Sequence, residues 1–112
     1  MNATIYHNPR CSKSRQTLQL LHDNGVEPTI IAYLETPPSA DELAGILVKL
    51  GKGPHDIMRK KEAQEEGIDM ALDDAALIDA LAAHPRALER PIVIIGDKAV
   101  MGRPPESVLD IL

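Results

Sequence analysis

The chain has 112 residues, of which 44% are hydrophobic and 26% are charged, and its formal net charge at pH 7 is -5. This composition excludes disordered and collagen-like chains and fits a single domain, and the acidic balance repels polyanions, so nucleic acid is not an expected partner. No apolar stretch approaches the roughly 20 residues of a membrane span, and the first residues lack the pattern of a secretion signal, so we expect a cytoplasmic protein without a membrane partner.

The first 35 residues predict a strand, a helix and a second strand. Residues 4–6 form a short apolar run with β-branched content, and a helix is expected to begin at Ser12 and to end at Asn24 and Gly25. Residues 29–34 form a continuous apolar run with β-branched side chains, which is typical of a buried strand. Because a helix separates the two strands, we expect them to be parallel.

The middle of the chain, about residues 39–86, is predicted to be a helical insert. Its first helix begins at Ser39, with acidic residues in the first turn, and ends at Gly51. A second helix is expected around residues 56–65. A third is expected over residues 74–84, where the following proline forbids continuation of the helix.

The last part of the chain predicts two strands, residues 92–95 and 99–101, joined by a short turn, and a final helix over residues 104–112. The order β-α-β, helices, β-β-α predicts an α/β fold with a mixed four-stranded sheet and helices on its faces. This is the outline of a thioredoxin-like fold in which the helical insert separates the β-α-β half from the β-β-α half. We therefore expect one domain over residues 1–112.

The only cysteine of the chain, Cys11, lies where the first predicted strand gives way to the first predicted helix. A helix N-terminus presents unpaired N–H groups and a partial positive charge, and Arg10, Lys13 and Arg15 add formal positive charge nearby. These groups stabilise a thiolate, and they can hold an oxyanion beside the sulfur. We therefore predict a reactive thiolate at Cys11 and not a buried apolar thiol, because its flanks are polar and cationic.

Other kinds of site fit the sequence less well. A redox pair would need a second cysteine at Ser14, so oxidised Cys11 must be resolved by an external thiol, such as glutathione or a partner protein. A phosphatase loop would place an arginine six residues after the cysteine, whereas Arg15 follows it by four. The four histidines are scattered, so no metal site is expected, and only His7, beside the loop, is given an electrostatic or hydrogen-bonding role.

An ordered set of short motifs runs along the whole chain: Tyr6-His7-Asn8-Pro9, Cys11, Ser14-Arg15, Tyr33-Leu34-Glu35, Pro37-Pro38, Arg59-Lys60, Arg90-Pro91-Ile92-Val93, Arg103-Pro104 and Val108-Leu109-Asp110-Ile111-Leu112. In this order the motifs resemble the ArsC-type arsenate reductases that work with glutathione and glutaredoxin. The cationic loop and the end of the chain at Leu112 resemble the short paralogues of that family.

The resemblance implies a set of site residues and a reaction. The thiolate of the cysteine would attack arsenate, and glutathione, as a co-substrate, would attack the arsenic–cysteine adduct and release arsenite. Glutaredoxin would then regenerate the thiol, with no bound cofactor and no metal. The resemblance also implies a cis peptide bond before Pro91. It assigns catalysis to Cys11, oxyanion binding to Arg59, Arg90 and Arg103, and supporting roles to His7 and Ser14.

Two other functions stay open. The protein could be a glutathione-dependent thiol oxidoreductase that acts on other substrates, such as mixed disulfides. Alternatively, it could be a regulatory module of the same fold that binds RNA polymerase, although such regulators carry a C-x-x-C switch that Ser14 removes. We expect a monomer, because no long apolar or heptad stretch calls for an interface.

Overall fold

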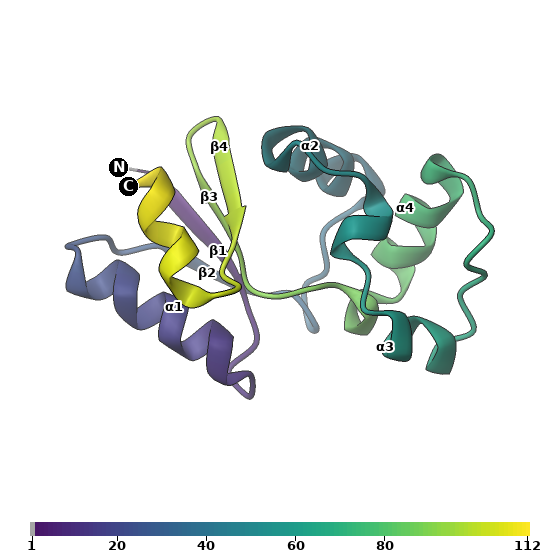
Figure 1. Cartoon of the computed structure of the whole chain (residues 1–112), viewed down its shortest axis with the longest axis horizontal. Helices are drawn as coiled ribbons and strands as arrows, with labels where there is room; N and C mark the ends of the chain where they lie inside the picture. The colour runs from purple at the N-terminus through teal and green to yellow at the C-terminus, as the bar shows by residue number, and fades with distance from the viewer. Residues whose placement is uncertain (1) are drawn as a thin grey trace. The chain divides into compact units, whose positions relative to one another are not determined.

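Residues from both ends of the sequence form one four-stranded sheet in the computed structural model, which describes residues 2–112 (Figure 1). The described chain falls into two compact units. The first contains residues 2–36 together with Arg90–Leu112, and the second is the continuous segment Pro37–Glu89. Within residues 2–112, no helix combines the length and the apolar character that crossing a membrane requires.

The sheet of the first unit is mixed, as predicted. Its strand order is β2-β1-β3-β4, with β1 parallel to β2 and antiparallel to β3, and with β3 antiparallel to β4. The four strands are β1 (Ala3–His7), β2 (Thr29–Ala32), β3 (Ile92–Ile95) and β4 (Lys98–Met101).

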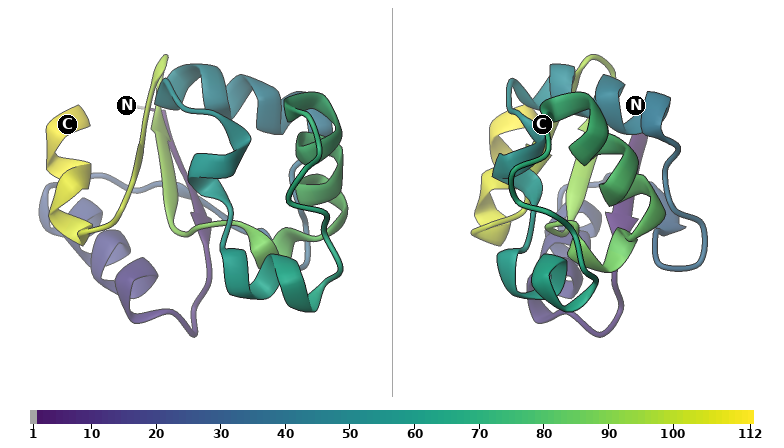
Figure 2. Two further views of the ribbon diagram at one scale, coloured as in Figure 1. Left: turned by 45° about the vertical axis from the view of Figure 1, so that its right-hand side comes forward. Right: turned by 90° about the vertical axis from the view of Figure 1, so that its right-hand side faces the viewer.

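Two helical segments of the first unit pack against each other and against the sheet (Figure 2). They are α1 (Ser12–Asp23) and η3 (Pro105–Ile111), and the second is a 3-10 helix over most of the predicted final helix. Ile5, Val93 and Val108 are fully buried in the core that joins β1, β3 and η3. Leu21 of α1 belongs to the same cluster and is also fully buried. Full burial of one such aliphatic side chain contributes about 1.5–3 kcal/mol to stability, so this cluster fixes α1 and η3 on the sheet.

The prediction of a buried strand over residues 29–34 is wrong in two respects. β2 lies at the edge of the sheet, and Ile30 is 51% exposed. The strand also stops at Ala32, because the N–H groups of Glu35 and Thr36 both donate to the Ala32 carbonyl, each at 2.9 Å, and close a turn. An apolar run does not reveal whether a strand has one neighbour or two, because the topology of the whole sheet decides that.

The second unit is built from helices. Within it α2 packs on α4, α4 on η1, and α3 on η2. The elements are α2 (Ala40–Leu50), η1 (Pro54–Ile57), α3 (Lys60–Glu65), α4 (Asp74–Ala83) and η2 (Pro85–Ala87).

The first helix of this unit begins and ends where the sequence predicts. The Ser39 hydroxyl accepts a hydrogen bond from the Glu42 N–H, and the Glu42 carboxylate accepts one from the Ser39 N–H, each at 3.1 Å. This reciprocal pair satisfies two N–H groups that the helix leaves without partners. At the other end Gly51 has a φ of 68°, which is the left-handed conformation that glycine adopts without strain.

The helix predicted over residues 56–65 is divided in two. The break falls at Met58 and Arg59, where Met58 forms a bridge with Leu88 and the Arg59 N–H donates to the Ala87 carbonyl at 2.7 Å. These partners are distant in sequence, and their backbone groups replace the bonds that a continuous helix would form. At this point tertiary contacts therefore override the local preference for a helix.

One glycine of the first unit lies in close contact with its neighbours. A Cβ added to Gly102 would clash with the Thr17 side chain and would lie 2.8 Å from Cγ of Pro91. We therefore expect Gly102→Ala to lower the free energy of unfolding by about 1–3 kcal/mol, as overpacking does. Urea unfolding measures the change.

Gly45 provides the matched control. It lies inside α2, and a Cβ added there meets nothing within 4 Å. Gly45→Ala should therefore raise the free energy of unfolding by about 0.5–1 kcal/mol, because alanine favours the helix. Equal destabilisation by the two substitutions would contradict the steric argument.

Candidate functional site

Cys11 occupies the N-cap of α1, directly after the loop that leaves β1. The Cys11 N–H donates to the Asn8 carbonyl at 3.0 Å, and the Arg10 N–H donates to the Asn8 side-chain oxygen at 3.0 Å. At the helix end, the Cys11 carbonyl accepts from the Arg15 N–H at 3.0 Å. Asn8 thus folds the loop into a turn, and the half-buried sulfur is held at the start of the helix.

The surroundings of the sulfur favour the thiolate. Partial burial by itself raises the pKa of the Cys11 thiol, but the backbone N–H of Ser14, the guanidinium of Arg90 and the backbone N–H of Lys13 all lower it. Arg90 acts both by hydrogen bonding and by its charge. The net result is a pKa below the ordinary value for cysteine, because hydrogen bonding and positive charge outweigh the loss of water.

The source of the positive charge differs from the one predicted. The sequence argument named the neighbouring cations Arg10, Lys13 and Arg15, but the guanidinium that lowers the pKa of Cys11 belongs to Arg90. The guanidinium of Arg15 instead donates to the Pro9 carbonyl at 2.9 Å. Lys13 contributes through its backbone N–H, so the helix terminus acts as predicted while the local side-chain charges do not.

Two of the predicted arginines lie at the sulfur. Nη2 of Arg103 is 3.7 Å from Sγ of Cys11, although the two residues are 92 positions apart. Nε of Arg103 donates to the Arg90 carbonyl at 2.9 Å, which links the two arginines. The peptide bond between Arg90 and Pro91 is cis, as predicted, and the bond between Arg103 and Pro104 is also cis, which the sequence reasoning missed.

The sheet pairing explains why these residues meet. Tyr6 pairs with Ile92, so the segment before β3 lies beside the end of β1, from which the loop to Cys11 departs. Ile92 also pairs with Met101, so the chain after β4 returns to the same place. The Gly102 N–H donates to the Pro91 carbonyl at 3.0 Å and holds the two segments together. The spacing of Cys11, Arg90 and Arg103 in the sequence does not indicate that they lie together, because the pairing of three strands brings them to one place.

His7 and Ser14 form a buried pair behind the loop. Nδ1 of His7 lies 2.6 Å from Oγ of Ser14, and the Asn8 N–H donates to the same oxygen at 3.1 Å. Burial first, and then the charge of Arg15, lower the pKa of His7, so the ring is neutral at pH 7. A neutral ring can accept the hydroxyl proton at Nδ1. These bonds anchor Ser14, whose own N–H lowers the pKa of the Cys11 thiol. The supporting roles of His7 and Ser14 in the reaction stay predictions.

The third predicted arginine belongs to the second unit. Arg59 is the N-cap of α3, and its Nε donates to the Glu62 carboxylate at 2.7 Å. Its Nη1 lies 3.8 Å from the Glu89 carboxylate. Two partly buried carboxylates therefore orient this guanidinium. The role of Arg59 at an oxyanion stays a prediction.

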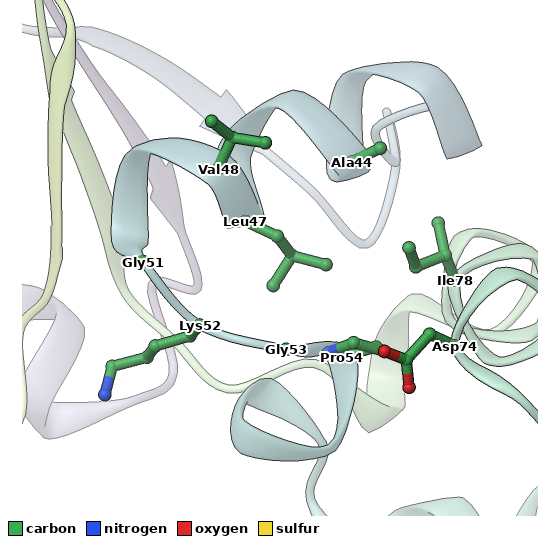
Figure 3. Close-up of a pocket in the computed structure, with 9 residues that line it drawn as sticks. All are labelled: Ala44, Leu47, Val48, Gly51, Lys52, Gly53, Pro54, Asp74 and Ile78. Carbon is green, nitrogen blue, oxygen red and sulfur yellow. The ribbon is translucent and has the colours of Figure 1, made fainter.

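A hollow of about 430 Å³ lies in the second unit, between α2 and α4 (Figure 3). Leu47 and Ile78 point into it, whereas Lys52 extends away from it. Its walls are mainly aliphatic and carry one carboxylate, that of Asp74, and no thiol. Thiol chemistry therefore belongs to Cys11 and not to this hollow.

The residues that the structure describes contain no group of three or more histidine, cysteine, aspartate or glutamate side chains that could hold a metal ion.

Comparison with known proteins gives a consistent result. A sequence profile of the ArsC family matches residues 6–111. An arsenate reductase of Haemophilus influenzae is 47% identical over 100% of both chains, and YfgD of Escherichia coli K12 is 50% identical over 96% of this chain and 94% of its own. The structure of an arsenate reductase from Vibrio cholerae superposes with a TM-score of 0.93 at 48% identity, covering 100% of this chain and 98% of the other.

Removal of the Arg90 charge should be visible at the sulfur. We expect Arg90→Gln to raise the pKa of Cys11, because the substitution removes both a hydrogen bond and a positive charge from the thiolate. The pH dependence of alkylation by iodoacetamide measures this pKa. The control is Lys98→Gln, which removes the same charge at the start of β4, at the opposite end of that strand from Arg103. If the pKa of Cys11 rises equally in both variants, the net charge of the protein and not the position of Arg90 sets that pKa.

The neutral His7 ring predicts a dependence of stability on pH. Because the folded pKa of His7 lies below its ordinary value of 6.5, the unfolded chain binds more protons than the folded chain in the range just below pH 6.5. The free energy of unfolding should therefore fall as the pH decreases from 6.5 towards the folded pKa. Urea unfolding at several pH values should show this slope for the wild type and a smaller one for His7→Gln.

A surface histidine provides the control for this measurement. His22 lies on the exposed side of α1, where its ring is 3.6 Å from the Glu27 carboxylate. His22→Gln should keep most of the wild-type slope below pH 6.5. If His7→Gln keeps the wild-type decrease in the free energy of unfolding below pH 6.5, the buried pair of His7 and Ser14 does not cause this pH dependence.

Proposed function

The chain belongs to the ArsC family, and we propose that it reduces arsenate to arsenite, with glutathione as the electron donor and Cys11 as the nucleophile. The observation that carries this proposal is the position of the Cys11 sulfur at a helix N-terminus, with its pKa lowered and with a guanidinium nitrogen of Arg103 at 3.7 Å. Relatives of 45–47% identity over nearly the whole chain are named arsenate reductases, which supports the choice of substrate.

The first step joins sulfur to arsenic. The thiolate attacks the arsenic atom of arsenate, an S–As bond forms, and one oxygen leaves as water after it takes up protons. The arsenate oxygens need hydrogen-bond donors and positive charge during this attack, and guanidinium groups supply both. Nε of Arg90 is buried and has no hydrogen-bond partner within residues 2–112. Such an unsatisfied donor costs about 1–3 kcal/mol, which an arsenate oxygen at this nitrogen would offset.

The second step moves two electrons to arsenic. Glutathione attacks the sulfur of the adduct, an S–S bond forms, and the S–As bond breaks with its electron pair remaining on arsenic, which leaves as arsenite. Each of the two sulfurs has then lost one electron. In place of a resolving cysteine the chain has Ser14, and its hydroxyl is bonded to His7 and Asn8, so Cys11 remains disulfide-bonded to glutathione.

The third step regenerates the enzyme. A glutaredoxin thiolate attacks the glutathione sulfur of the mixed disulfide, and Cys11 leaves as the thiolate. The low pKa of Cys11 makes it a good leaving group in this exchange. Because the cycle consumes reduced thiols, the proposal places the protein in a reducing compartment, the cytoplasm.

The test is arsenate-dependent oxidation of NADPH in the presence of glutathione, glutaredoxin and glutathione reductase. Cys11→Ser should lower the rate by at least about 10³-fold, because the serine hydroxyl does not ionise at neutral pH and cannot form the disulfide. Circular dichroism and urea unfolding should show that the variant is folded. A variant with the wild-type rate would exclude Cys11 as the nucleophile.

Two other outcomes would replace the proposal. If the wild type does not reduce arsenate but does reduce glutathionylated substrates, the protein is a glutathione-dependent oxidoreductase with another substrate. If it shows no thiol turnover and is retained on RNA polymerase, it is a regulatory module of the same fold.

A further inference from the structure

Another hollow lies in the first unit, and three of the residues that line it directly precede Cys11 in the sequence. It has a volume of about 280 Å³, close to the lower limit of about 300 Å³ for pockets that hold small molecules. One wall is the loop of Asn8, Pro9 and Arg10 that leads to Cys11. The other wall contains Leu34 and Glu35, from the turn after β2. This size fits a ligand of a few residues and not a folded protein.

The parallel pairing of β1 and β2 explains why these two walls face each other. His7 pairs with Ala32, so the two strands end side by side, and the chain leaves both strands at the same end of the sheet. Asn8 fixes the first wall, because its side chain accepts from the Arg10 N–H at 3.0 Å. The Ala32 carbonyl fixes the second, because it accepts from the N–H groups of Glu35 and Thr36. The hollow is therefore built from hydrogen-bonded turns.

The hollow is lined in part by Ala32, the last residue of β2. β2 is an edge strand, so half of its backbone N–H and C=O groups face away from β1. Extended peptides commonly bind at such edges. Leu34 is 47% exposed beside this edge and offers an apolar surface to a ligand.

The charges in the hollow match one end of glutathione. Arg10 and Glu35 are both exposed and line the same hollow. The γ-glutamyl end of glutathione carries a carboxylate and an ammonium group on one carbon atom, so it can pair with a guanidinium and a carboxylate at the same time. We infer that this hollow binds the γ-glutamyl end of the glutathione that attacks the Cys11 adduct, an inference that rests on the proposed function.

The position along the chain agrees with this reaction. The thiol of glutathione belongs to the residue next to its γ-glutamyl end, and Cys11 is the residue next to Arg10. Because consecutive Cα atoms are about 3.8 Å apart, Cys11 lies within one residue length of Arg10, and the glutathione thiol lies within one residue length of its γ-glutamyl anchor. These two lengths are short enough for the glutathione sulfur to reach the sulfur of the adduct, so that the S–S bond can form while the S–As bond breaks. Holding the two groups together favours the reaction over attack by free thiol.

Direct binding can be tested without turnover. S-methylglutathione keeps both charged ends of glutathione but cannot react, because its sulfur is methylated. Titrated into the wild-type protein, it should shift the backbone amide NMR signals of Asn8, Arg10, Leu34 and Glu35. The signals of the far end of β4, at Lys98, should stay in place. Shifts confined to other regions, or none at millimolar ligand, would overturn the inference.

Charge reversal separates a specific contact from general electrostatics. Arg10→Glu should raise the KM for glutathione about tenfold, the size of one charge-assisted hydrogen bond, with kcat at saturating glutathione unchanged. Glu35→Lys should raise the same KM, although general attraction to the anionic glutathione would lower it. A lower KM in Glu35→Lys would show that only net charge acts, and would exclude the ammonium contact.

Truncated thiols identify the end that binds. With the wild type, γ-glutamylcysteine should react nearly as well as glutathione, whereas cysteinylglycine, which lacks the γ-glutamyl group, should show a KM about tenfold higher. Arg10→Glu should abolish this difference. If Arg10→Glu keeps the wild-type difference in KM between γ-glutamylcysteine and cysteinylglycine, the γ-glutamyl group does not bind at Arg10.

A matched control variant and the binding experiment distinguish an error in the assignment of the hollow from an error in the proposed function. Lys98→Glu makes the same change of charge as Arg10→Glu at the opposite end of the sheet, and it should leave the KM for glutathione unchanged. An equal rise in both would overturn the assignment to the hollow. The titration with S-methylglutathione uses no arsenate, so it tests the hollow even if the wild type fails to reduce arsenate and the proposed function is wrong.

Discussion

The placement of β1 between β2 and β3 is the constraint on which the rest of the site depends. Because β1 pairs with β2, the loop that carries Cys11 begins beside the turn after Ala32. Because β1 pairs with β3, Arg90 lies at the same end of the sheet. The β3–β4 pairing then returns the chain so that Arg103 reaches the sulfur. Loss of the β1–β3 pairing or of the β3–β4 pairing would separate Cys11 from these two arginines. The thioredoxin-like fold thus assembles the site from segments at both ends of the chain.

The thiolate is stabilised by two kinds of group with different origins. The N–H groups of Lys13 and Ser14 belong to the first turn of α1 and exist wherever a helix begins at this residue. The Arg90 guanidinium comes from the distant segment before β3. Burial of the sulfur opposes both, because it removes water from the charged form. The same groups that stabilise the negative sulfur are suited to an oxyanion, so in the proposed reaction one set of donors would serve both the thiolate and the substrate.

Local chemistry made most of the fold predictable, and distant contacts account for the errors. The helix from Ser39 to Gly51 was predictable because a side-chain cap and a left-handed glycine are encoded at its ends. The break at Met58 was not, because its partner Leu88 lies 30 residues further along the chain. The exposure of β2 was missed for a similar reason, since an apolar run contains no information on how many strands flank it. At the site, the position of Cys11 at a helix N-terminus was predictable from neighbouring residues, but the local charges did not identify Arg90 as the cation that lowers its pKa.

The sequence by itself determined where the candidate nucleophile, Cys11, lies and that it has no second cysteine as a partner. A cysteine at a strand-to-helix junction, with Ser14 in place of a second cysteine, is enough to predict a thiolate that depends on an external thiol. These features are properties of adjacent residues, which the chain holds together in any fold that forms the helix. Only the tertiary structure decided that Arg90 and Arg103 supply the positive charge, and that the loop before Cys11 faces the turn after β2 to form a hollow. Those distances depend on strand pairing, because charges far apart in sequence interact only when the fold brings them within a few ångströms.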